Sequence, residues 1–132
     1  MSDSRFKLAV CQVRTELEKR QTMDKAEAMV REAAENGAAV VALPEMFSCP
    51  YTRRYFDSFA EPQNGESVGR MSCWAREYGV ILVGGSIPER EGKELYNTCF
   101  VFDKTGKIIA RHRKAHMFDV DIAGGITFKE SD

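Results

Sequence analysis

The sequence Ala38-Ala39-Val40-Val41-Ala42-Leu43-Pro44-Glu45 decides the fold class of this chain. Its first six residues form a continuous apolar run, which is typical of a central parallel strand covered on both faces. Pro44 ends the strand, and the acid Glu45 follows it directly. Ligands of α/β sheets usually lie beyond the carboxyl ends of the parallel strands. The stretch therefore predicts a buried strand with a candidate functional residue at its end.

The segment before this strand predicts a strand followed by a helix. Alternating β-compatible residues over 6–13 indicate an opening strand that is buried on at least one face. Helical spacing predicts a helix from about Met23 to Asn36, with Thr22 as its N-cap and Asn36-Gly37 as its left-handed stop. Together with the apolar run, these elements form a βαβ unit.

The segments after the apolar run repeat the pattern of helix and strand. Residues 44–66 indicate a long loop with one short helix, residues 67–78 a helix, and residues 80–83 a third buried strand. Residues 95–102 and 107–112 predict a hairpin around the turn 103–106, and the tail from Arg113 shows no clear period. The order indicates an α/β architecture with a mixed sheet.

Composition limits the class of protein. The chain has 132 residues with a net charge of -1, 43% hydrophobic and 30% charged residues, which indicates a folded chain of single-domain size. This charge balance indicates no nucleic-acid partner. No apolar run approaches the roughly 18 residues of a membrane span, and the start does not resemble a signal peptide, so we expect no membrane partner and a cytoplasmic location.

Glu45 is the first candidate for chemistry. A carboxylate withdrawn from water at the rim of a sheet can serve as a general base. The alternative is a carboxylate that only caps a helix or lies in a loop.

The basic cluster Arg111-His112-Arg113-Lys114-Ala115-His116 is the second candidate. Two histidines four residues apart can share a helical face and bind a metal, but the expected strand and the lack of a third ligand cluster argue against zinc. The functional alternative to a solvated strand end is one ammonium that turns inward to meet a carboxylate.

Two further features are better explained by packing than by chemistry. Gly84-Gly85-Ser86 lacks the spacing of a phosphate loop, so we expect close backbone packing there. Among the four separate cysteines, Cys49 lies nearest to Glu45 along the chain, but a nucleophilic role would require an activating base and a lowered pKa. We interpret Cys49 as a bystander.

Several motifs together resemble the nitrilase, or carbon-nitrogen hydrolase, superfamily over nearly the whole chain. The motifs that occur in the family's order are Leu43-Pro44-Glu45-Met46-Phe47, Gly84-Gly85-Ser86-Ile87-Pro88-Glu89, Tyr96-Asn97-Thr98 and Arg113-Lys114-Ala115-His116-Met117-Phe118. The segments that resemble its omega-amidase branch are Ser48-Cys49-Pro50-Tyr51, Phe118-Asp119-Val120-Asp121-Ile122 and Ile126-Thr127-Phe128-Lys129-Glu130-Ser131.

The resemblance implies roles for three residues. The family hydrolyses nonpeptide carbon-nitrogen bonds with a Glu, Lys and Cys triad and needs no cofactor or metal. Glu45 matches its general base, Lys114 matches its lysine, and Glu130 resembles the additional active-site glutamate. The family nucleophile lies some way beyond the lysine. No cysteine follows Lys114 here, and none of the four cysteines matches that nucleophile, so we expect this chain to lack it.

The resemblance also implies a fold and a function. Residues 1–132 are expected to be a partial domain, the N-terminal half of a four-layer αββα nitrilase-type sandwich, with an apolar sheet face left uncovered. The parent enzyme is expected to be a homodimer or higher homo-oligomer that uses water to hydrolyse small dicarboxylic monoamides, and this chain alone is expected to be inactive. The alternatives are a noncatalytic truncated or binding half-domain, and a nitrilase or carbamoylase of the same superfamily.

Overall fold

The computed structural model describes residues 5–125 and 127–130, so Ile126 and Ser131 of the last motif lie outside the described residues. The strands of the main sheet are β1 (Lys7–Val10), β2 (Ala38–Ala42), β3 (Ile81–Val83), β4 (Ile87–Glu91), β5 (Glu94–Phe102) and β6 (Ile108–Arg113). The helices are α1 (Lys19–Glu35), α2 (Arg53–Phe59) and α3 (Glu66–Tyr78). A separate hairpin consists of β7 (Asp119–Asp121) and β8 (Thr127–Lys129).

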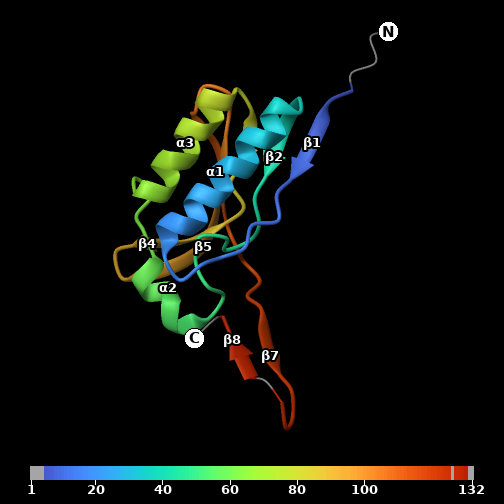
Figure 1. Ribbon diagram of the computed structural model, residues 1–132. Coiled ribbons are helices and arrows are strands. Elements are labelled where there is room, and N and C mark those ends of the chain that lie inside the picture. Colours follow the sequence, from blue (N-terminus) through green and yellow to red (C-terminus); the bar gives the residue numbers. More distant parts are fainter. Residues whose placement is uncertain (1–4, 126, 131–132) are drawn as a thin grey trace.

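The main sheet is mixed, as predicted. Strands β1, β2 and β3 are parallel neighbours, and β5 is antiparallel to β3, β4 and β6. Helices α1 and α3 lie side by side against one face of the sheet, while the β7–β8 hairpin projects away from the body of the molecule (Figure 1). The βαβαβ order and the β5–β6 hairpin are therefore confirmed.

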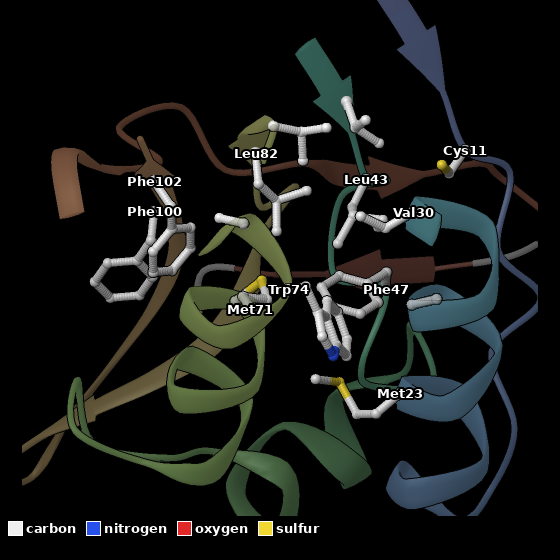
Figure 2. Packing of buried hydrophobic residues seen from close by; sticks show 14 of the residues in the cluster. Cys11, Met23, Val30, Leu43, Phe47, Met71, Trp74, Leu82, Phe100 and Phe102 are labelled. Carbon is white, nitrogen blue, oxygen red and sulfur yellow. The ribbon is translucent and has the colours of Figure 1, made fainter. Parts of the chain in front are cut away.

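The core lies between α1, α3 and the sheet (Figure 2). Met23 of α1 and Met71 and Trp74 of α3 pack with Phe47 and Leu82, and all of them are at most 2% exposed. Burial of a large apolar side chain stabilises a fold by about 1.5–3 kcal/mol. This layer therefore supports the sheet from one side.

The opposite face of the sheet is open in the described part of the chain. On β1, Leu8 is 56% and Val10 is 78% exposed, whereas Ala9 is partly buried against the core, and Cys11, just after the strand, is buried in it. The opening strand is confirmed with one face toward the core, but it ends at Val10 instead of continuing to Val13. The prediction that residues 38–43 are covered on both faces is wrong for the described residues, because Val40 and Ala42 of β2 stay partly exposed.

The start of α1 differs from its prediction. The helix begins at Lys19, and Thr22 lies inside its first turns, fully buried. The Thr22 hydroxyl oxygen accepts a hydrogen bond from the backbone N–H of Glu16 at 2.8 Å, so it ties the preceding loop to the helix instead of capping the helix end. The predicted stop is confirmed, because Gly37 has a φ of 83°.

Candidate active site

The turn after β2 holds Glu45 by close backbone packing. The backbone N–H of Met46 donates to Ser86 Oγ at 2.8 Å. A Cβ atom added to Gly85 would lie 2.0 Å from the carbonyl oxygen of Pro44, so only glycine fits there. The expectation that Gly84-Gly85-Ser86 serves backbone packing is confirmed, and its effect is to fix the turn that carries Glu45.

Lys114 follows β6 and brings its ammonium to two carboxylates. Its backbone N–H donates to the carbonyl oxygen of Asn97 at 2.9 Å, which ties the end of β6 to β5. Its Nζ atom lies 2.8 Å from Glu45 Oε1 and 2.9 Å from Glu130 Oε2. The structure therefore brings all three residues selected from the sequence into one cluster.

The β7–β8 hairpin carries Glu130 into this cluster. The Phe128 ring of β8 stacks on the Tyr51 ring, with centroids 5.4 Å apart, which anchors the hairpin to the loop after Glu45. The backbone N–H of Phe118 donates to Glu130 Oε2 at 2.7 Å, and the Glu130 side chain is only 4% exposed. The sequence showed no period in this tail because β7 and β8 are three residues each.

Asn97 completes the cluster, and sequence reasoning assigned it no role. Its Nδ2 atom donates to Glu45 Oε1 and to Glu130 Oε1, both at 2.9 Å. Asn97 is 7% exposed in the middle of β5. A polar residue inside a predicted strand, within the quoted Tyr96-Asn97-Thr98 motif, was the signal that could have revealed it.

Electrostatics differ between the members of the cluster. Burial opposes the charge on Lys114, but hydrogen bonds to Glu45 and Glu130 and their negative charges outweigh it and raise the lysine pKa. Burial likewise opposes ionisation of Glu130, but hydrogen bonds from Asn97, the Phe118 backbone and Lys114 outweigh it and lower the Glu130 pKa. Both groups are therefore charged at neutral pH.

The two carboxylates differ in exposure and in bonding. The Glu45 side chain is 52% exposed, so it is not withdrawn from water as its place at the sheet rim had suggested, because no described segment covers that side. Both described hydrogen bonds to Glu45 fall on Oε1, which leaves Oε2 unbonded among the described residues. Glu130 has both oxygens engaged. Of the two carboxylates, Glu45 is therefore the one with an oxygen that no described residue bonds.

A cavity of about 230 Å³ adjoins the cluster. The residues that line it are Glu45, Gly85, Ser86, Asn97, Cys99, His112 and Lys114. Glu45 and Lys114 thus both border one small opening. This volume suits a small molecule rather than a polymer.

His112 and Cys99 line the cavity, but the described histidines and cysteines form neither a metal site nor a reactive thiol. His112 lies on β6 and His116 beyond its end, so the two do not share a helical face, and the described residues contain no group of three or more His, Cys, Asp or Glu that could hold a metal. Burial raises the pKa of Cys49 to about 12 and also raises that of Cys99. These thiols are therefore poor nucleophiles, in agreement with the interpretation of Cys49 as a bystander.

A second charged cluster lies on the other face of the same strands. Arg113 Nε and Nη2 donate to the two oxygens of Glu89 at 3.0 and 3.1 Å, and the Thr98 hydroxyl donates to Glu89 at 2.6 Å. The guanidinium also lies 3.7 Å from the centroid of the Tyr96 ring. The Glu89 side chain is 2% exposed, so this carboxylate is closed to ligands.

Comparisons with known proteins agree with this geometry. Residues 7–132 match the carbon-nitrogen hydrolase family. Omega-amidase NIT2 of Mus musculus is 46% identical over 128 residues, which cover 97% of this chain and 46% of the relative. Omega-amidase NIT2 of Homo sapiens is 45% identical over 126 residues, which cover 96% of this chain and 46% of the relative. The chain thus spans about half the length of the curated relatives it matches.

Solved structures give the same result for the fold. The Saccharomyces cerevisiae protein Nit3, a member of branch 10 of the nitrilase superfamily, has a TM-score of 0.74 and 32% identity, with 82% of this chain and 44% of Nit3 covered. The C. elegans NitFhit protein has a TM-score of 0.81 and 25% identity, with 94% of this chain and 31% of NitFhit covered. Among the described helices, none is long and apolar enough to cross a membrane. The family match, the shared fold and the motifs identify this chain as a member of the carbon-nitrogen hydrolase family.

Proposed function

We propose that the complete protein is an amidase of the omega-amidase type, which hydrolyses the amide of small dicarboxylic monoamides and releases ammonia. One observation carries the proposal: the Lys114 ammonium lies 2.8 Å from Glu45 and 2.9 Å from Glu130, beside a cavity of small-molecule size. The omega-amidase relatives at about 45% identity support the substrate class. In this proposal, 2-oxoglutaramate and 2-oxosuccinamate are the substrates to test first.

The proposed nucleophile is a cysteine outside these 132 residues. Glu45 Oε2 takes the proton of the thiol, and the sulfur attacks the amide carbonyl carbon. The Lys114 ammonium stabilises the oxyanion of the tetrahedral intermediate. The carbon-nitrogen bond then breaks, and ammonia leaves with the proton that Glu45 held, so that a thioester remains.

Water completes the proposed cycle. Glu45 accepts a proton from a water molecule as the water oxygen attacks the thioester carbon. The carbon-sulfur bond breaks, the acid product leaves, and the leaving thiolate takes the proton that Glu45 held, which restores the thiol and the Glu45 carboxylate. Glu130 keeps its charge throughout and balances the Lys114 ammonium, because both of its oxygens are already hydrogen-bonded.

A noncatalytic half-domain is the second candidate. The observation in its favour is that burial raises the pKa of Cys99, the cysteine that lines the cavity, so that this thiol is a poor nucleophile. A nitrilase or carbamoylase is a further alternative, because these enzymes share the glutamate and the lysine. In each of the enzymatic cases, residues 1–132 supply the base and the ammonium, and a second segment supplies the nucleophile.

Ammonia release decides between these candidates. The protein encoded by the complete reading frame is incubated with omega-amides, nitriles and carbamoyl amino acids, and ammonia is measured. Release from 2-oxoglutaramate or 2-oxosuccinamate at a rate above that from the other two classes is expected. Release only from nitriles or carbamoyl compounds would replace the substrate class, and release from none of them would favour the noncatalytic half-domain.

A further inference from the structure

Asn97 contacts every charged residue of the candidate site. Its backbone carbonyl oxygen accepts a hydrogen bond from the Lys114 backbone at 2.9 Å. Its side-chain Nδ2 donates to Glu45 and to Glu130, both at 2.9 Å. Since β5 pairs with both β4 and β6, the Asn97 backbone has little freedom to move. One residue on a fixed strand therefore holds the three others in place.

The charge balance of the cluster explains why a neutral donor is needed. Two carboxylates face one ammonium, so their mutual repulsion favours protonation of one of them. Hydrogen bonds to an ionised carboxylate favour the ionised form. The two amide hydrogens of Asn97 supply one such bond to each carboxylate without adding a charge. An aspartate at this position would have the same shape and would offer only acceptors.

The bonding pattern also gives the two carboxylates different capacities. The Asn97 and Lys114 bonds to Glu45 fall on the same oxygen, Oε1, whereas on Glu130 they fall on different oxygens. Glu130 is therefore saturated, while Glu45 keeps one oxygen free. We propose that Asn97 is a positioning residue that holds Glu130 as a permanent counter-ion and turns Glu45 so that a single oxygen is left to carry the proton. The mechanistic part of this inference rests on the proposed function.

Other titratable groups around the cluster bear on any measurement of its protonation. Tyr51 comes from the loop after β2, and its pKa is raised by burial and by the charges of Glu130 and Glu45. Asp119 of β7 accepts the backbone N–H of Glu130 at 2.9 Å. His112 of β6 lines the same cavity. Tyr51 also interacts with Glu130 by a side-chain hydrogen bond, but none of these three groups has described hydrogen bonds to both Glu45 and Glu130, as Asn97 does.

Two substitutions test whether the side-chain N–H donors of Asn97 matter apart from the size and shape of the side chain. Asn97→Asp keeps the shape and removes the donors, and Asn97→Leu keeps the volume without any polar atom. Asn64→Asp is the matched control, because Asn64 is exposed and its side chain makes no hydrogen bond to the described residues. All three are made in the protein encoded by the complete reading frame. The rate of ammonia release is measured against pH, and the Glu130 carboxyl is titrated by carbon-13 NMR, assigned with Glu130→Gln.

The expected result has two parts. Both Asn97 variants lose about 100-fold in kcat/KM, which is the effect of losing hydrogen bonds to charged groups. The Glu130 titration and the acid limb of the rate profile both move to higher pH, because the ionised carboxylates lose their donors. Asn64→Asp changes neither the rate nor the titration.

The outcomes that contradict the inference differ from the outcome that contradicts the proposed function. A Glu130 titration that stays in place while the unfolding midpoint falls would show that Asn97 has only a structural role. Full activity in Asn97→Leu would overturn the inference outright. If the unsubstituted protein releases no ammonia, the proposed function fails, and the NMR titration still decides whether Asn97 holds Glu130 in its ionised form.

Discussion

Arg113 and Lys114 are neighbours in the chain, yet their side chains serve opposite faces of the sheet. Successive residues at a strand end point to opposite sides. Arg113 meets Glu89, whose side chain is 2% exposed, on the side of the helices. Lys114 meets Glu45, whose side chain is 52% exposed, beside a cavity. Both are cation and carboxylate pairs with contacts near 3 Å, so contact distance does not distinguish them.

The difference lies in how much of each pair is left for another molecule. The planar guanidinium of Arg113 binds both oxygens of Glu89 and stacks on Tyr96. These contacts within the chain leave neither oxygen of Glu89 for a ligand. The ammonium of Lys114 is a compact charge with rotatable donors, next to a carboxylate oxygen that has no described partner. The Arg113–Glu89 pair, which is the sealed pair, holds strands of the sheet together. The Lys114–Glu45 pair, which is the open pair, can also contact a ligand.

Removing the ammonium should have the largest effect. Lys114→Met in the complete protein is expected to lower the rate of ammonia release by at least about 1000-fold, because the developing oxyanion loses its charge partner. The unfolding midpoint is measured alongside and is expected to fall as well, because Glu130, whose side chain is 4% exposed, loses its counter-ion. The control is Lys104→Met, in the exposed turn after β5. Activity near that of the control would remove Lys114 from the mechanism.

Removing the proposed base should come next. Glu45→Gln keeps the size of the side chain and is expected to lower the rate by about 100-fold to 10,000-fold, as general acid-base groups do. Glu35→Gln, at the exposed end of α1, is the matched control. If Glu45→Gln slightly lowers the maximal rate and leaves the pH dependence of the rate unchanged, Glu45 would be assigned to substrate binding instead.

Substitution in the sealed pair should change the stability of the fold and not the rate of ammonia release. Glu89→Gln is expected to lower the free energy of unfolding by about 2–3 kcal/mol, because a buried ionic hydrogen-bond partner is lost. Glu91→Gln serves as the control, since Glu91 bonds the same guanidinium at 3.0 Å but is 61% exposed. Denaturant unfolding measures both. Equal losses in the two variants would mean that burial does not distinguish these contacts.

The pH dependence of Glu130 should be the smallest effect. Burial opposes its ionisation, but its hydrogen bonds place its folded pKa below the ordinary value of 4.5. A group with a lowered folded pKa stabilises the fold above pH 4.5, and that contribution disappears as the pH falls through the folded pKa. The difference in unfolding free energy between the unsubstituted protein and Glu130→Gln should therefore shrink below pH 4.5. The same difference measured with Glu35→Gln should stay flat.

The sequence predicted the elements whose residues follow a hydrophobic period. The helix over 67–78, the strand after Gly79 and the β5–β6 hairpin were predictable because apolar side chains and glycine stops mark them. Strand β4 was missed, since its sequence Ile-Pro-Glu-Arg-Glu buries the charged Glu89 instead of an apolar residue. Because the buried Glu89 belongs to an ion pair between strands, the sequence of β4 lacks the alternation of apolar and polar residues that predicts a strand.

The candidate site was predictable only in part. The end of the apolar run led to Glu45, the family motifs selected Lys114 and Glu130, and the structure brings the three together, although their roles stay predictions. Asn97 was missed because its importance depends on contacts 52 and 33 residues away along the chain, which no local pattern contains. Residue type suggests which groups can carry chemistry, but only the fold shows which group holds the others.

Gly85 has a consequence for how this site tolerates change. A single methyl group at that position would collide with the Pro44 carbonyl at 2.0 Å and would push away the turn that carries Glu45. A substitution there would therefore impair the proposed chemistry without contacting any reacting atom. The position of Glu45 therefore depends on the absence of a Cβ atom at residue 85.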